Sequence, residues 1–376
     1  MSNRTKNKDS ILKNKVLQSL LTSILCILLG LLVGFIALLI INPSGAWEAI
    51  CDILKNFMTY SKKQSQLKYL GNTLVKTAPL IMCSLSVLFA YKAGLFNIGA
   101  AGQYVVGTGA ALYFALALNM PWYVCLLAAI VAGAILGAIS GLLKAYCNVN
   151  EVISCIMLNW ISLYLVNMLL GTVKDAASPY TFRLSTTNKS AVIPSLGLGK
   201  LFTNNQYVTI AVPLSILVAL VIWVILEKTK LGYELKATGS NRNAARYCGM
   251  QEKKNLILTM AFAGALAAMG AAFFYLSGFE EWMCTQSSVP GMGFNGIAAA
   301  FLGGLNPIGT IFSSFFIQHI TNGGAYVDKT MYCSQISDLI SSIIIYLCGF
   351  VLFFKLTLNK RIDAWQEKKL KNGGNK

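Results

Sequence analysis

The stretch KLGYELKATGSNRNAARYCGM (residues 230–250) is a polar segment between two long apolar runs. Ser240 or Asn241 can cap the start of a helix, and Gly249 can end it. The segment is too short to fold alone, so we predict a short helix that lies across a membrane surface. The small residues Gly239, Ala244, Ala245 and Gly249 favour close approach of a partner. The alternative is a solvated loop that is basic only because it faces the cytoplasm.

The composition is that of a membrane protein. Of the 376 residues, 56% are hydrophobic and only 12% are charged, whereas a soluble domain exposes far more charge. The net charge of +17 comes mainly from residues 1–15, 228–254 and 355–376, which hold 19 of the 31 Lys and Arg and flank apolar runs. The positive-inside rule places all three stretches in the cytoplasm. No basic stretch is interleaved with stacking aromatic residues on a soluble domain, so nucleic acid is not an expected partner.

The sequence carries no pattern for catalysis or metal binding. Ten scattered Cys without a CxxC pair and a single His do not fit a disulfide framework or a zinc site. The GxxxxGK[ST] phosphate loop and the GxSxG nucleophile motif are both missing from the sequence, so no catalytic residue is predicted. The energy for any transport must come from another subunit or from a gradient.

The apolar runs predict an all-α polytopic membrane protein with about 8–10 transmembrane helices. We divide the chain into a basic cytoplasmic tail (1–15), a transmembrane domain (16–355) and a second basic cytoplasmic tail (356–376). Within the domain, residues 171–206 form an outer loop, which can receive a substrate-delivering protein. Residues 228–255 form a cytoplasmic loop.

Two glycine-rich stretches interrupt the transmembrane pattern. They are GLFNIGA at residues 94–100 and GFNGIAA at residues 293–299. Each leads into an apolar segment that is broken or too short to span comfortably, and the two begin on opposite sides of the membrane. This correspondence predicts interrupted helices and an inverted repeat, which places a substrate path between the halves. Over about 20 positions, coincidence is the alternative.

Polar and aromatic residues near these stretches are candidates for the substrate path. The amides of Asn97, Gln103, Asn159 and Asn295 need partners in hydrocarbon, and they can bond sugar hydroxyls or base edges. Phe96, Trp160 and Phe294 can stack on a base or simply pack in the protein. The alternative for each amide is a structural role, in which neighbouring backbone satisfies it.

Several motifs, taken in order, resemble a known family. They are LVKTAPL (74–80), KAGLFNIG (92–99), NEVI (150–153), MLN (157–159) and the stretch 232–250. Together they resemble permease subunits of bacterial ABC importers, in the branch of the branched-chain amino acid and ribose permease family that serves nucleosides and simple sugars. The resemblance covers roughly residues 71–352.

The resemblance implies a type II importer fold of about ten helices in the bacterial cytoplasmic membrane, with both termini cytoplasmic. It implies four partners: membrane lipid, a second permease subunit, an extracytoplasmic substrate-binding lipoprotein, and a separate ABC ATPase. The second permease is expected to be a different chain, and a second copy of this chain is the alternative. This chain would bind no cofactor, and the ATPase would use the ATP. Residues 241–249 would be the coupling helix, with Arg246 within it and Gly239 and Ser240 just before it. The chain departs from the family at Ala101, where we expect Glu.

The resemblance favours a nucleoside as the substrate, with a simple sugar such as ribose or galactose as the alternative. A gradient-driven carrier is a second class, but the sequence places no acidic residue at the middle of a predicted span. A membrane scaffold without transport is a third class, which the polar residues within the interrupted helices disfavour.

Overall fold

The computed structural model describes residues 15–328 and 330–333, together with single residues and pairs between 339 and 360. Most of the two predicted basic tails, 1–15 and 356–376, therefore lies outside the described residues. The described part is helical apart from short connections and two isolated β-bridges, Lys174 with Thr181 and Tyr180 with Met283. This confirms the all-α prediction.

The chain divides into two compact units. The smaller unit combines residues 1–53 with residues 324–376, and the larger unit is Leu54–Gly323. In the smaller unit, helix α2 (Lys15–Ile41) is followed by most of α3 (Ala46–Lys55). The Tyr332 hydroxyl donates a hydrogen bond of 2.6 Å to the carbonyl oxygen of Asn42 at the end of α2. This bond ties the two chain segments of the smaller unit together.

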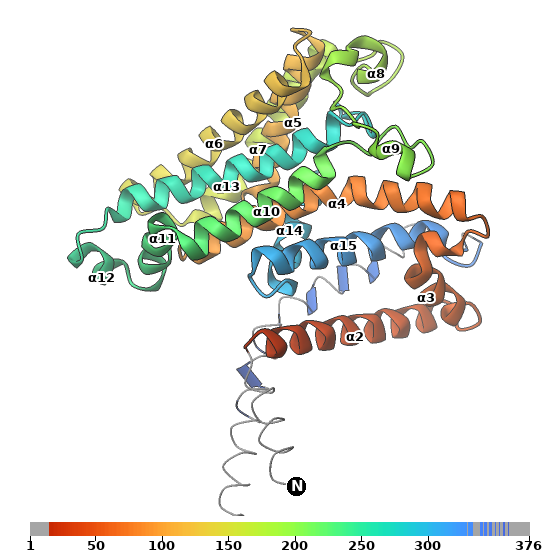
Figure 1. The fold of residues 1–376 in the computed structure, drawn as a ribbon, viewed down its shortest axis with the longest axis horizontal. Coiled ribbons are helices and arrows are strands. Elements are labelled where there is room, and N and C mark those ends of the chain that lie inside the picture. Colours follow the sequence, from red (N-terminus) through yellow and green to blue (C-terminus); the bar gives the residue numbers. More distant parts are fainter. Residues whose placement is uncertain are drawn as a thin grey trace, which may run out of the picture. The chain divides into compact units, whose positions relative to one another are not determined.

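The larger unit is a bundle of long helices with short helices in its connections. The long helices are α4 (Lys63–Lys92), α5 (Ala100–Leu116), α6 (Trp122–Cys147), α7 (Glu151–Leu170), α10 (Ala211–Lys228), α13 (Glu252–Tyr275), α14 (Met292–Leu302) and α15 (Pro307–Gly323). The short α-helices are α8 (Leu184–Thr187), α9 (Leu198–Leu201), α11 (Lys230–Ser240) and α12 (Arg242–Tyr247), with 3₁₀ helices at Asn56–Thr59, Gly171–Val173 and Lys189–Ala191. Figure 1 shows α8 and α9 at one end of this unit and α11 and α12 at the other.

Six helices of the described chain, α2, α4, α6, α7, α10 and α13, are long and apolar enough to cross a membrane. Among them, α4 is 89% buried over its most apolar window and α6 only 28%. A helix that is apolar all round and buried is central, whereas one that buries a single face leaves the other to lipid. The polytopic membrane class is therefore confirmed, with α4 and α13 at the centre of the larger unit.

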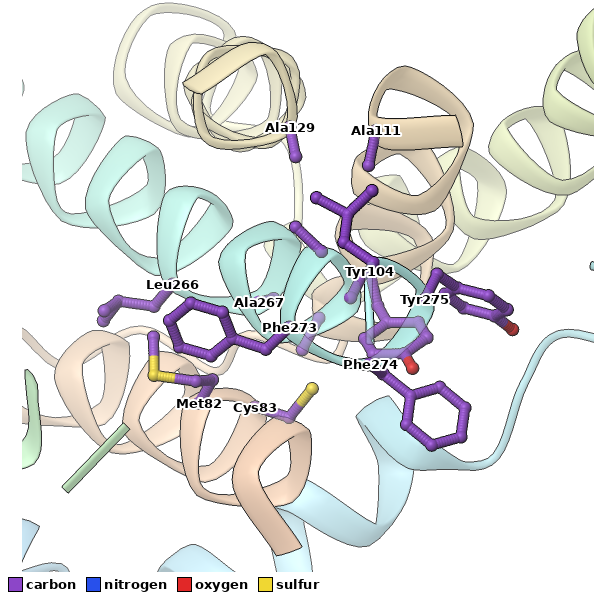
Figure 2. Close-up of a cluster of buried hydrophobic side chains, with 14 of the residues drawn as sticks. Met82, Cys83, Tyr104, Ala111, Ala129, Leu266, Ala267, Phe273, Phe274 and Tyr275 are labelled. Carbon is purple, nitrogen blue, oxygen red and sulfur yellow. The ribbon is translucent and has the colours of Figure 1, made fainter. Parts of the chain in front are cut away.

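The core lies where α4, α5 and α13 meet. Figure 2 shows Tyr104 of α5 beside Phe274 and Tyr275 of α13, with Met82 and Cys83 of α4 nearby, and all five are buried. Burial of large aromatic side chains contributes strongly to stability. This cluster fixes the position of the shortened helix α5 against α4 and α13.

The helices α5 and α14 both start inside the larger unit. Residues 93–99 lead into α5 from the end of α4, and residues 285–291 lead into α14 from the loop that follows α13, neither as a helix. We call these segments the first and second lead-in. Gly293 lies so close to Ala101 that a Cβ on Gly293 would be 2.4 Å from the Ala101 Cα. The helix starts therefore meet after approaching from opposite ends of the unit, which confirms the predicted interruptions and supports the predicted inverted repeat.

Candidate functional site

The first lead-in is held by amide side chains. Asn97 Nδ2 donates to Ser86 Oγ on α4 at 3.0 Å and to Gln103 Oε1 on α5 at 2.8 Å. The Gln103 Nε2 group donates back to Asn97 Oδ1 at 3.3 Å. Asn97 is fully buried and Gln103 nearly so. Because a buried amide without partners is costly, these mutual bonds fix residues 93–99 against α4 and α5.

A third buried amide, on a neighbouring helix, caps the start of α5. Asn159 on α7 accepts a hydrogen bond from the Gly102 N–H at 2.8 Å and donates one to the Ile98 carbonyl at 3.2 Å. The backbone N–H groups in the first turn of a helix have no partner within the helix. Asn159 therefore does for α5 what an N-cap side chain usually does. The structure brings Asn97, Gln103 and Asn159 together around this helix start.

The other four predicted path residues lie in different surroundings. Phe96 and Asn295 are half-buried, while Phe294 and Trp160 are exposed. Trp160 stacks on Tyr164 with ring centroids 6.3 Å apart. The Asn295 side chain has no hydrogen-bond partner among the residues that the structure describes. Contact of any of the seven residues with substrate remains a prediction.

The predicted short helix in residues 230–250 is present as α12. Asn241 Oδ1 accepts from the Ala244 N–H at 3.0 Å, so Asn241 is the cap, and Ser240 is the last residue of the preceding helix α11. After the helix, Gly249 adopts a φ of +80°, which glycine reaches without steric cost. The capping prediction is thus confirmed at both ends of α12.

The small residues of this region serve two different purposes. Gly239 lies against the backbone of Ala93 and Gly94, so that a Cβ on Gly239 would come within 2.6 Å of both. Ala245 is also buried within the chain. Ala244 and Gly249 are exposed. The sequence therefore predicted the need for close approach, but at Gly239 the close neighbour is the first lead-in of the same chain.

Sequence reasoning missed Tyr247 on α12. Its side chain is 93% exposed, and it lies three residues after Ala244 and next to Arg246, which is also exposed. Residues three apart share a helix face. The sequence signal that would have identified Tyr247 is its helical spacing: Ala244 and Tyr247 follow the predicted cap at Asn241 at intervals of three residues.

The opposite end of the unit holds a charged cavity. A cavity of about 370 Å³ is lined by residues that include Arg183, Tyr207, Phe279 and Glu281. Arg183 Nε lies 3.3 Å from Glu281 Oε1, and Lys76 Nζ lies 5.6 Å from the centre of the Phe279 ring. Lys76 stands within the LVKTAPL motif, but sequence reasoning did not select it, although a lone Lys in an apolar run was the available signal.

The neighbouring Glu280 has a perturbed carboxyl. Partial burial removes water from the Glu280 carboxyl and raises its pKa. The positive charge of Lys76 lowers this pKa, and the negative charge of Glu281 raises it further. No group of three or more His, Cys, Asp or Glu within the described part of the chain can hold a metal ion. The cavity at this end is bordered by the Arg183–Glu281 ion pair.

Comparison with known proteins gives one family model, described as "Branched-chain amino acid transport system / permease component", which matches residues 69–349. A guanosine ABC transporter permease protein of Bacillus subtilis is 31% identical over 92% of this chain and 97% of its own length. A nucleoside ABC transporter permease protein of Lactococcus lactis subsp. cremoris is 30% identical over 95% and 99%. A glucose ABC transporter permease protein of Haloferax volcanii is 29% identical over 89% and 88%. No solved structure gives a significant match.

Proposed function

The chain belongs to the family of permease components of branched-chain amino acid transport systems, and from this premise we propose that it is the permease subunit of an ATP-driven ABC importer for nucleosides. The observation that carries the proposal is the match of the guanosine and nucleoside permeases over more than nine-tenths of this chain. A simple sugar is the second candidate substrate, because the glucose permease matches at nearly the same identity.

The charge pattern supports one orientation in the cytoplasmic membrane. The basic stretches at 1–15, 228–254 and 355–376 favour a cytoplasmic position for both termini and for the α11–α12 end. The loop with α8 and α9 then lies outside, where an extracytoplasmic substrate-binding lipoprotein would dock. The cavity around Arg183 and Glu281 belongs to this outer end and offers the lipoprotein charged partners.

We assign α12 as the coupling helix that inserts in a cleft of a separate ATPase. Its exposed surface offers an aromatic and a guanidinium side chain, Tyr247 and Arg246, which are the residue types that dominate binding energy at interfaces. Movement of α12 can reach the transmembrane part through the contact between Gly239 at the end of α11 and Gly94 in the first lead-in. ATP hydrolysis is left to the partner, since this chain has no phosphate loop.

A second permease subunit completes the proposed assembly, and we expect it to be a different chain. The resemblance implies a substrate path between two permeases, and α7 presents an exposed apolar face with Trp160, Tyr164 and Met168. Such a face can pack against a neighbouring helix bundle in the membrane. Membrane lipid would cover the remaining apolar faces.

Uptake of labelled guanosine tests the substrate. In cells that lack the chain we expect guanosine uptake to fall to the background level, and a plasmid copy should restore it. Excess unlabelled glucose should leave the restored uptake unchanged. Uptake that is the same with and without the chain would reject the nucleoside proposal, and competition by glucose would favour the sugar alternative.

Coupling is tested at Gly249. The substitution Gly249→Trp should leave membrane insertion intact but disconnect ATP hydrolysis from uptake, because the indole would obstruct the surface that meets the ATPase. Gly197→Trp is the matched control, since Gly197 also has a positive φ and open space where a Cβ would lie, with no atom within 4 Å, but is near α9 at the other end. If Gly249→Trp transports as well as Gly197→Trp, the coupling assignment is wrong.

A further inference from the structure

The second lead-in, residues 285–291 with the sequence TQSSVPG, is an exposed polar segment without helical structure. Thr285, Ser287, Ser288 and Gly291 are all exposed. Gln286 makes the few local hydrogen bonds: its N–H donates to the Met283 carbonyl, and its side chain donates to the Ser288 carbonyl. The segment therefore consists mainly of small polar residues, and its backbone makes few hydrogen bonds.

Contacts with neighbouring helices place this segment at membrane depth. Its upper end is fixed by Asn167 of α7, whose Nδ2 donates to the Gln286 carbonyl at 2.8 Å. Its lower end passes into Gly293, which lies on Ala101, next to the Gly102 that Asn159 of α7 caps. Asn159 and Asn167 are eight residues apart on a helix, or about 12 Å along its axis. Since α7 is one of the candidate spans, the chain from Gln286 to Gly293 descends through about 12 Å of the membrane.

Several polar groups of this segment have nothing to bond to in the chain. The N–H groups of Ser287, Ser288 and Val289, and the hydroxyls of both serines, have no hydrogen-bond partner among the residues described by the structure. Lipid cannot satisfy such groups, and non-helical backbone at membrane depth occurs only where protein covers it or water fills a cavity beside it. Lipid contact is thereby excluded for this face.

We propose that residues 285–291 line the hydrated substrate passage, and that Ser287, Ser288 and their backbone N–H groups bond the hydroxyls of the solute. This inference rests on the proposed function and deepens it. Small hydroxyl side chains beside open N–H groups suit a neutral, hydroxyl-rich solute, and the exposed ring of Phe294 just below offers a face on which a base can stack. A surface covered by a partner subunit would instead have an apolar centre.

Cysteine accessibility in the complete assembly, reconstituted in liposomes, tests the proposal. The background chain keeps only the buried cysteines Cys26, Cys83, Cys125, Cys155 and Cys284 and has serine at the others. In this background, Ser288→Cys is compared with Val131→Cys. Val131 is also exposed, but it lies on α6, where the helix satisfies the backbone and lipid can cover the side chain. A charged methanethiosulfonate reagent reacts with thiolate, which forms only where water reaches the sulfur.

We expect Ser288→Cys to react at least ten times faster than Val131→Cys, modification to block guanosine uptake, and guanosine to slow the reaction. Equal, slow rates at both positions would overturn the proposal and show that a partner covers the segment. Fast reaction without protection and with undiminished uptake would also overturn it, since the segment would then be wet but off the path. Guanosine uptake by the unlabelled background chain reports separately on the proposed function, because reactivity is measured whether or not guanosine is carried.

Discussion

The same Phe-Asn pair occurs twice in opposite surroundings, as Phe96–Asn97 in the first lead-in and as Phe294–Asn295 just after the second. Asn97, before α5, is fully buried and bonded to Ser86 and Gln103. Asn295, in the first turn of α14, is half-buried, and its side chain has no partner within the described residues. The same local pattern therefore serves as a fixed part of the framework in one half, while in the other half it leaves polar groups available to water or a ligand.

The difference follows from enclosure. The first lead-in lies against α4, α5 and α7, so every amide there had to find a protein partner or bear the cost of burial. The second lead-in reaches the surface, where solvent can bond it. Ala101 lies fully buried where the two helix starts meet, so the Glu that the family resemblance led us to expect is replaced here by a side chain that needs no partner.

The largest effect is expected where the starts of α5 and α14 touch. Gly293→Val would place a branched side chain against the Ala101 backbone, where even a Cβ has only 2.4 Å. We expect a loss of on the order of 3 kcal/mol or more, seen as a low yield of monodisperse protein in detergent. Gly291→Ala is the control, since nothing lies within 4 Å of a Cβ at that position. Normal yield of Gly293→Val would show that the helix starts do not meet this closely.

Effects of intermediate size are expected on substitution of Asn97 and of Asn295, the asparagines of the two Phe-Asn pairs. Asn97→Ala leaves Ser86 and Gln103 without their shared partner and should cost about 1–3 kcal/mol, lowering the Tm while the KM for guanosine stays the same. Asn295→Ala should do the reverse, leaving the Tm unchanged and raising the KM. A KM change without a Tm change in Asn97→Ala would place Asn97 on the substrate path and break the contrast.

The smallest effect is expected at the cap of α5. Asn159→Ala removes the acceptor for the Gly102 N–H and should cost about 1 kcal/mol, as the loss of a cap usually does. Trp160→Ala, at the exposed neighbouring position, should change stability by less than about 0.5 kcal/mol. Thermal unfolding of both variants in detergent gives the comparison. Equal Tm values would mean that water replaces Asn159 and that the first lead-in is less enclosed than its contacts indicate.

Features that depend on neighbouring residues alone could be predicted from the sequence. Mean composition and apolar run length fixed the membrane class, Asn241 and Gly249 fixed the ends of α12, and the glycine-rich stretches fixed the two interruptions. Each feature is local because a helix satisfies the hydrogen bonds of its own backbone. Its length, caps and breaks therefore depend on consecutive residues.

The packing of segments that are distant in the chain sets which polar groups are satisfied. It brought Gly239 against Gly94, set Asn159 on the start of α5, and left Asn295 and Ser288 open, although the amides look alike in the sequence. The physical reason is that a hydrogen bond needs a partner within about 3 Å, and here those partners come from segments far apart in the chain. Packing therefore decides whether an amide side chain is bonded within the protein or is available to a ligand.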